Sequence, residues 1–291
     1  MTYKTVEIPF QSCVSNYKNS SVVIFSSPMD STTSFRPGTR FAGNAIRVDS
    51  FGVEWYSPYF DMSLKDVDTC DIGDLDLPIG DVNKSLKIIE QVSTKIINDD
   101  KKPMMIGGEH LVSLGVVRSL VKKYNNLHII HLDAHTDLRD EFFGMKLSHA
   151  TVLRRCYDLV GNNKIFQFGI RSGDREEFEW SKGKTQLRKF DLVGLKETIG
   201  KLKDVPVYIT IDLDVLDPAY FPGTGTPEPG GITFKELLEA VQDFDKLENI
   251  VGADIVELAP HYDASGASTA VACKILREMI LLLHRQKKHY F

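Results

Sequence analysis

The chain lacks several features that mark specialised classes of protein. Its 291 residues include only four cysteines, Cys13, Cys70, Cys156 and Cys273, and no C-x-x-C spacing, which excludes a disulfide framework and a sulfur-based metal site. Lysine and arginine form no basic stripe and the formal net charge is -5, so no nucleic-acid partner is expected. No hydrophobic run approaches the roughly 18 residues of a membrane span, and residues 1–20 lack a signal-peptide pattern. We therefore expect a cytoplasmic protein without a membrane partner.

Alternating strand and helix signals fill the rest of the chain. The composition, 42% hydrophobic and 26% charged, is that of a globular protein, and no repeat or linker divides residues 1–291, so we predict a single domain. The expected strands are 21–25, the run before Gly107, a run from 127, 164–168, 186–190, a run from 207, and 249–256. The expected helices are 81–98, one around 114–121, 234–244 with Thr233 as N-cap and Glu236 in a capping box, and 267–284. At least seven strands alternating with helices predict an α/β fold with a mostly parallel sheet covered on both faces.

Acidic residues and histidines recur at three places, each directly after a short apolar run, in segments 104–110, 129–137 and 208–214. Such runs are typical of buried parallel strands, and ligands of open α/β sheets gather at the carboxyl ends of these strands. We therefore expect six side chains to point into one crevice: His110, Asp133, His135, Asp137, Asp212 and Asp214.

The spacing of these residues favours metal binding. Side chains of an extended segment alternate faces, so Asp133, His135 and Asp137 share one side, as do Asp212 and Asp214. An isolated Asp-x-Asp is more often a turn or helix cap, but so many carboxylates without a cation would repel one another. An oxygen-rich set with few imidazoles favours Mn2+, with Fe, Co and Zn as alternatives. Six ligands are too few for two closed shells, so some carboxylates are expected to bridge a pair of ions.

In order and spacing, three blocks resemble the signature motifs of the ureohydrolase family, the arginases and agmatinases. They are Gly107-Gly108-Glu109-His110, Asp133-Ala134-His135-Thr136-Asp137 and Ile211-Asp212-Leu213-Asp214-Val215-Leu216-Asp217-Pro218. The resemblance runs nearly end to end and implies a three-layer α/β/α sandwich around a mostly parallel sheet of about eight strands. It also implies two Mn2+ ions per chain, one held by His110, Asp133, Asp137 and Asp212 and the other by Asp133, His135, Asp212 and Asp214, with Asp133 and Asp212 bridging.

The resemblance gives roles to two further residues. His149 matches the position of the family's proton shuttle, which protonates the leaving amine. Glu257 matches the glutamate that holds a planar guanidinium by paired, charge-assisted hydrogen bonds. Asp137 is counted as catalytic as well as a ligand. Without the resemblance, His149 would be interpreted as a surface or capping histidine and Glu257 as a solvated carboxylate.

The loop after the second block distinguishes subfamilies. Residues 138–151 lack the Ser/Asn-rich stretch with which arginases bind an α-carboxylate and α-amino group, and resemble agmatinases, as do 35–41, 168–173 and 260–270. We therefore predict a binuclear manganese hydrolase that cleaves a small cationic guanidino substrate, agmatine, to putrescine and urea in polyamine biosynthesis. Residues 41–47 depart from the family's Gly-Pro after the aromatic residue, which we interpret as a variation in loop shape.

Other functions remain as alternatives. An acidic contact at the distal end of the pocket would favour an ammonium, whereas Arg or Lys would favour a carboxylate, as in guanidinobutyrate or arginine. A deacetylase-type amidohydrolase would use fewer ligands, usually for one zinc, and His110 and Asp137 speak against it. A non-catalytic homologue would have to lose activity elsewhere than in these residues. Since family members commonly form trimers or hexamers, a homo-oligomer is expected.

Some remaining residues receive structural interpretations. His128 and His131 lie within an expected strand and are interpreted as hydrogen-bonded structural histidines. His261 is either a loop contact or part of the substrate pocket. The Pro/Gly-rich segment 222–231 lacks the lysine of a phosphate-binding loop, so we expect a rigid loop at the mouth of the site.

Overall fold

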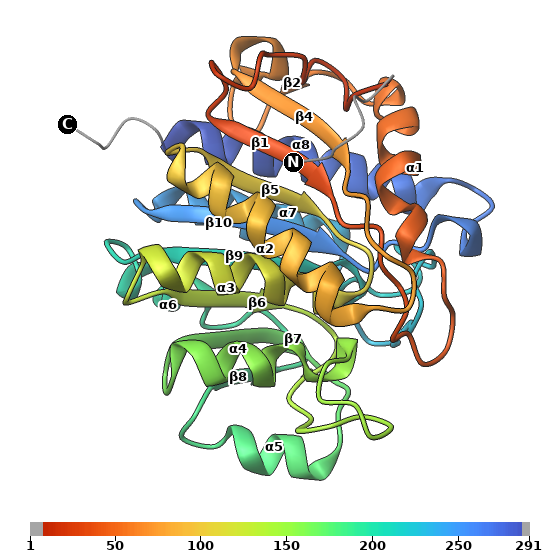
Figure 1. The fold of residues 1–291 in the computed structure, drawn as a ribbon, viewed down its shortest axis with the longest axis vertical. Helices are drawn as coiled ribbons and strands as arrows, with labels where there is room; N and C mark the ends of the chain where they lie inside the picture. Colours follow the sequence, from red (N-terminus) through yellow and green to blue (C-terminus); the bar gives the residue numbers. More distant parts are fainter. Residues whose placement is uncertain (1–7, 287–291) are drawn as a thin grey trace.

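The computed structural model describes residues 8–286 and has one large parallel sheet at its centre (Figure 1). Residues 1–7, the first part of the segment in which no signal peptide is predicted, lie outside the described part. The sheet has eight strands in the order β4-β1-β5-β10-β9-β6-β7-β8, and every neighbouring pair is parallel. The strands are β1 (Val22–Ser26), β4 (Thr69–Asp74), β5 (Lys102–Ile106), β6 (His128–Leu132), β7 (Ile165–Ile170), β8 (Gln186–Lys189), β9 (Val207–Asp212) and β10 (Ile250–Val256), with a separate antiparallel pair β2 (Tyr56–Ser57) and β3 (Met62–Ser63).

Helices cover both faces of the sheet and complete three layers. They are α1 (Ala42–Asp49), α2 (Val82–Asn98), α3 (Ser113–Lys123), α4 (Val152–Val160), α5 (Arg175–Ser181), α6 (Leu195–Lys201), α7 (Phe234–Asp243) and α8 (Ala267–Arg285). Figure 1 shows α2, α3 and α4 in front of the sheet, with α6, α7 and α8 behind it. α1 packs on α8, and α5 lies beyond the β8 edge. The predicted three-layer α/β/α fold is confirmed. Among the helices of residues 8–286, none combines the length and apolar character of a membrane span.

Buried side chains on both faces explain why the strands appear in the sequence as unbroken apolar runs. On β1, Val22 and Ile24 join the core cluster that includes α8, whereas Val23 and Phe25 join the cluster that includes α2 and α3. Burial of each such side chain contributes roughly 1.5–3 kcal/mol. The central strands are thereby fixed in place, and with them the loops at their carboxyl ends.

Two helices begin where the sequence predicts. Thr233 caps α7 by accepting a hydrogen bond from the Glu236 amide at 3.2 Å, while the Thr233 amide donates to Glu236 Oε2 at 2.8 Å. Asp81 caps α2 through a 2.9 Å hydrogen bond from the Lys84 amide. The predicted capping box is confirmed.

The interpretation of residues 41–47 as a loop is wrong, because this stretch enters helix α1 at Ala42. Ala42 and Ile46 are buried against α8. Gly43 allows the close approach, since a Cβ at this position would lie 2.2 Å from Ser26 Oγ. The helix is therefore fixed by packing that the sequence pattern does not reveal.

Candidate metal centre and substrate pocket

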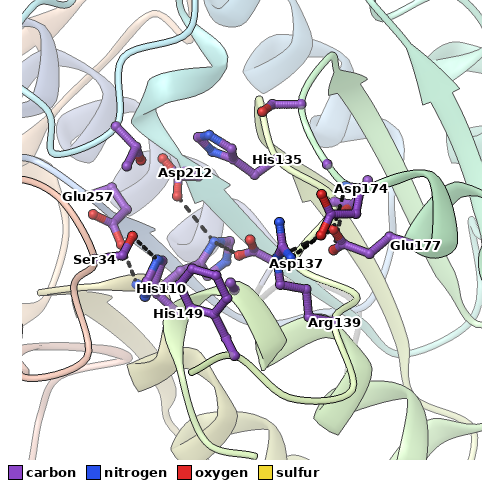
Figure 2. Close-up of a pocket in the computed structure, with 16 residues that line it drawn as sticks. Ser34, His110, His135, Asp137, Arg139, His149, Asp174, Glu177, Asp212 and Glu257 are labelled. Carbon is purple, nitrogen blue, oxygen red and sulfur yellow. Dashed lines mark hydrogen bonds and ion pairs between the residues drawn. The ribbon is translucent and has the colours of Figure 1, made fainter. Parts of the chain in front are cut away.

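The candidate ligands come from the carboxyl ends of neighbouring central strands, which meet at one edge of the sheet. His110 begins the 3-10 helix η4 (His110–Val112) after β5, and Asp133, His135 and Asp137 follow β6. Asp212 ends β9, Asp214 lies in the 3-10 helix η6 (Leu213–Val215), and Glu257 follows β10. Figure 2 shows His110, Asp137, Asp212 and Glu257 around one pocket.

Three carboxylates converge on one nitrogen of His110. The His110 Nδ1 atom lies 3.1 Å from Asp133 Oδ2, 3.2 Å from Asp137 Oδ2 and 3.2 Å from Asp212 Oδ2. This nitrogen is buried and makes no hydrogen bond, whereas Nε2 of the same ring is 2.9 Å from Thr210 Oγ1. Possible ligand atoms of His110, His131, Asp133 and Asp137 all lie within 4.8 Å of one another. With Asp212 beside His110, they form an oxygen-rich donor set suited to a divalent cation.

A second cluster shares Asp133 with the first. His135 Nδ1 lies 3.0 Å from Asp214 Oδ2 and 3.5 Å from Asp133 Oδ1, and Asp214 Oδ2 is buried without a hydrogen bond. Asp133, His135 and Asp214 could hold a second ion. The Oδ1 atom of Asp212 accepts a 2.9 Å hydrogen bond from the Asp214 amide. This bond connects the Asp212 carboxylate with the second cluster. The structure therefore brings all six expected ligands into two adjoining groups.

The shifted pKa values of these residues show that so many negative charges, buried close together without a cation, are unfavourable for the protein. Burial raises the pKa of Asp212 and of Glu257 well above the ordinary carboxyl range, and nearby Asp214 adds to both shifts. Burial also raises the pKa of Asp137 to about 6. Burial opposes charge on His110, yet its carboxylate neighbours outweigh burial and raise its pKa. A bound divalent cation would relieve the repulsion among these carboxylates.

His149 and Glu257 face the cavity above these clusters, which has a volume of about 250 Å³. His149 lies in the 3-10 helix η5 (His149–Thr151), with Nε2 3.3 Å from Ser34 Oγ and Nδ1 3.2 Å from Ser148 Oγ. Burial lowers the pKa of His149 to about 4, and the nearby His135 and His110 add to this shift. The imidazole is therefore unprotonated at neutral pH and able to accept a proton.

The main chain at Glu257 has a positive φ of 65°, a conformation that L-residues seldom adopt. Its Oε1 atom accepts a 2.7 Å hydrogen bond from the His110 amide, and its own amide donates to the Gly108 carbonyl at 3.0 Å. These contacts hold a buried carboxylate at the pocket wall beside the His110 cluster. Asp137 also has a positive φ, 52°, so two residues of the site depend on surrounding contacts for their backbone conformation.

The loop that carries His149 is tied to the residue before His110. Glu109 is fully buried and accepts hydrogen bonds from the Thr32 amide at 2.8 Å and the Thr32 hydroxyl at 2.7 Å. The Thr32 hydroxyl oxygen in turn accepts a 3.0 Å hydrogen bond from the His149 amide. Glu109 thus connects the β5 turn with the His149 loop. Burial raises the pKa of Glu109 to about 7.

The sequence analysis did not identify Arg139, Asp174 and Glu177, which lie on the far side of the pocket from Glu257 (Figure 2), or Phe142, which also lines the pocket. Arg139 forms an ion pair with Asp174, lies 3.6 Å from Glu177 Oε2 and stacks 4.9 Å from the Phe142 ring centre. Glu177 also accepts amide hydrogen bonds from Leu138 and Asp174 at 2.9 and 2.8 Å. Asp174 follows β7, so the strand-end rule that found the other acidic residues could have found it as well.

The structure also places the residues that received structural interpretations. Thr226, from the Pro/Gly-rich loop, lines the pocket. His128 contacts the Asn126 carbonyl at 2.9 Å, and His131 contacts Asp133. His261 packs on Phe41 and Tyr262 in a loop contact and is not among the residues that line this pocket.

Comparison with known proteins places this geometry in a family. Residues 20–282 match the arginase family. The chain belongs to the arginase family. An agmatinase of Bacillus cereus is 50% identical over 269 residues, covering 91% of this chain and 93% of the relative. A guanidinobutyrase of Pseudomonas aeruginosa is 32% identical over 269 residues, covering 88% and 84%. The solved structure of the agmatine ureohydrolase of Thermoplasma volcanium is 33% identical, with a TM-score of 0.89 and coverage of 98% and 97%. This arginase-family chain thus shares its fold and most of its length with enzymes that act on guanidino compounds.

Proposed function

We propose that this arginase-family enzyme hydrolyses agmatine to putrescine and urea, as a step of polyamine biosynthesis. The observation that carries the proposal is a pocket in which Glu257 faces two adjoining clusters of possible metal ligands, with further carboxylates at its other end. Agmatine carries a cation at each end, which suits this distribution of charge. The identity to curated agmatinases at about half of the aligned positions supports the same substrate.

We assign the metal positions to the two clusters. His110, Asp133, Asp137 and Asp212 would hold one Mn2+, and Asp133, His135, Asp212 and Asp214 would hold the other. The buried, unpartnered His110 Nδ1 and Asp214 Oδ2 atoms support this assignment. The oxygen-rich donor set favours manganese over zinc. When bound, such ions lower the pKa of water and supply a hydroxide nucleophile at neutral pH.

The protein side chains bind the substrate and move the proton. Glu257 would accept hydrogen bonds from the guanidinium and orient its carbon towards the clusters. His149, unprotonated at neutral pH, would take up the proton released when water adds to this carbon and give it to the leaving amine nitrogen. Asp137 would itself be a ligand, and its carboxylate would place a negative charge beside His110.

The distal end of the pocket favours an ammonium group. Asp174 and Glu177 supply two carboxylates there, and Arg139, already paired with Asp174, supplies one cation. Arg139 is also the specific observation that keeps guanidinobutyrate as a second candidate, because an arginine released from Asp174 would pair with a distal carboxylate.

The test is urea release by the manganese-loaded protein with agmatine, guanidinobutyrate, arginine and guanidinopropionate. We expect the highest kcat/KM for agmatine and loss of activity in Asp133→Asn, a variant that conserves size but removes a shared ligand charge. A preference for guanidinobutyrate would leave the chemistry intact and overturn the assignment of the distal pocket. Absence of urea from all four compounds would overturn the proposed activity.

We further propose that residues 1–291 act as one catalytic domain in the cytoplasm, as a trimer or hexamer. All four cysteines lie in the described part of the chain and none is paired, which fits a reducing compartment. Phe35, Phe41 and Phe51 are 64%, 51% and 65% exposed, an amount of accessible aromatic surface that fits burial between subunits. Light scattering would test the assembly, and a monomer at working concentration would overturn it.

A further inference from the structure

His131 is a fully buried histidine that lies beside three of the candidate metal ligands, His110, Asp133 and Asp137. It lies on β6, two residues before Asp133, and does not line the substrate pocket. Residues two apart in an extended segment face the same side, so His131 and Asp133 share a side, and the His131 ring centre lies 5.1 Å from that of His110. Its Nε2 atom is 2.7 Å from Asp133 Oδ2, the same oxygen that lies 3.1 Å from His110 Nδ1.

Gln167 on β7 determines which nitrogen of His131 carries the proton. The Gln167 amide nitrogen donates to the Thr136 carbonyl at 2.8 Å, a partner that can only accept, so the orientation of the amide is fixed. The Gln167 Oε1 atom accepts from the Thr185 hydroxyl at 3.1 Å, which agrees with this orientation. The same amide nitrogen lies 3.1 Å from His131 Nδ1. Nδ1 is therefore an acceptor, and Nε2 carries the hydrogen that is donated to Asp133.

Both oxygens of Asp133 are consequently held by hydrogen-bond donors. Oδ1 accepts from the His135 amide at 2.5 Å, and Oδ2 accepts from His131. These two hydrogen bonds restrict rotation of the carboxylate, and each oxygen keeps a further lone pair, Oδ2 beside His110 and Oδ1 beside His135. Neighbours that orient a ligand in this way typically change metal affinity 10- to 100-fold.

We propose that His131, with its tautomer set by Gln167, is a positioning residue that orients Asp133 towards both metal positions. This inference rests on the proposed two-metal site. It assigns to His131 a role in metal affinity without direct ligation, since its Nε2 hydrogen lies between the ring and Asp133. Histidine itself is required because it can accept from Gln167 on one side and donate to the carboxylate on the other.

The test is calorimetric titration of the chelator-treated, full-length protein with Mn2+. We expect His131→Leu to bind both ions with affinity about 10- to 100-fold lower. His131→Gln, which can place an amide donor near the former Nε2 position, should stay closer to the parent protein. His128→Leu, on the same strand but away from the clusters, is the matched control and should bind like the parent. Unfolding temperatures measured with chelator present would show that any loss does not come from misfolding.

Several outcomes would overturn the inference. Unchanged affinity in His131→Leu would show that His131 does not orient Asp133, and loss of one ion altogether would make it a direct ligand. If the leucine variant fails to fold, a nitrogen–proton correlation spectrum of the 15N-histidine-labelled parent protein decides the question, because a hydrogen on Nδ1 would contradict the proposed tautomer. Failure of the metal site itself would look different: the parent protein would not bind Mn2+, or Asp133→Asn would bind it as tightly as the parent.

Discussion

Asp174 and Arg139 face Glu257 across the pocket, where the far end of a bound agmatine would lie (Figure 2). We expect Asp174→Asn to lower kcat/KM for agmatine at least tenfold, because a hydrogen bond to a charged group contributes about 1.5–3 kcal/mol. Activity on guanidinobutyrate should be maintained or raised, since the substitution releases Arg139. Asparagine still suits the first position before α5. Steady-state kinetics with both substrates measure the ratio, and exposed Glu176→Gln on the same helix is the control. An equal loss on both substrates would argue against a role in selecting the ammonium.

Thr32 is the residue through which Glu109 supports the His149 loop. We expect Thr32→Val, which removes the hydroxyl but keeps the branched shape, to lower kcat about 2- to 10-fold, corresponding to a hydrogen bond of about 0.5–1.5 kcal/mol. KM and manganese content should stay close to the parent values because the substitution does not alter Glu257 or the proposed metal ligands. Thr32→Ser restores the hydroxyl and serves as the control. A rise in KM without a change in kcat would contradict this assignment.

At the scale of the residue, the sequence is sufficient to identify site residues that lie close together along the chain. Asp133, His135 and Asp137 can be found because one strand end places them together. Arg139 could not be assigned, because its partner Asp174 is 35 residues away on another loop. The role of His131 was hidden for the same reason, since it depends on Gln167 on the adjacent strand.

At the scale of the element, the start of α8 depends on Asp263. This buried carboxylate accepts amide hydrogen bonds from Ser265 at 3.0 Å and Ser268 at 2.7 Å, and also their hydroxyls. Burial opposes its ionisation, but these hydrogen bonds outweigh burial and lower its pKa to about 2. The stabilisation is therefore present above the ordinary value of about 4 and is lost as the pH falls towards 2.

We expect Asp263→Ala to lower the free energy of unfolding by about 1 kcal/mol at neutral pH, as for loss of a helix cap. The difference from the parent protein should shrink as the pH falls below about 4. Thermal unfolding at several pH values measures this, with exposed Asp76→Ala as the control. A difference that grows in acid would contradict a stabilising carboxylate.

Among the strands of the large sheet, those that the sequence predicts and the one that it misses differ in how their polar groups are satisfied. Seven of the eight strands of the sheet were expected, but β4 was not, because Asp71 and Gly73 interrupt its apolar pattern. Arg47 from α1 reaches Asp71 with hydrogen bonds of 2.8 and 2.9 Å, which makes a buried aspartate acceptable in a strand. A partner in a distant helix cannot be inferred from the strand's own residues.

At the scale of the whole molecule, the site sets how stability depends on pH. In the chelator-treated protein, the raised pKa values of Asp137, about 6, and Glu109, about 7, contribute stability that is present at low pH and is lost as the pH rises through these values. The raised pKa values of His110 and His135 act in the same direction above the ordinary histidine value of about 6.5. We therefore expect a lower unfolding temperature at pH 8 than at pH 6.5. The lowered pKa of His149 has the opposite effect on stability, but this effect falls below the pH range that is compared.

Addition of Mn2+ should reverse this dependence, because the metal binds the deprotonated ligands. At one hundred times its dissociation constant, a single bound ion adds about 2.7 kcal/mol of stability. Scanning calorimetry with and without Mn2+ measures both effects, and Mg2+ controls for general ionic strength. A metal-free protein that becomes more stable between pH 6.5 and pH 8 would contradict the assignment of buried, unpaired charge to this site.

The position of β10 affects how the enzyme is made in the cell. Within residues 8–286 this strand, Ile250–Val256, is the last of the sheet along the chain, yet it lies in the middle, between β5 and β9. During synthesis on the ribosome, the other seven strands of the sheet are made before β10. Because β10 lies between β5 and β9, these two strands cannot join in one sheet until residue 256 has left the exit tunnel. His110 would reach the aspartates of β6 and β9 only at that moment. The two candidate metal clusters are consequently expected to form only after β10 has been synthesised, and a product terminated before β10 would lack the complete set.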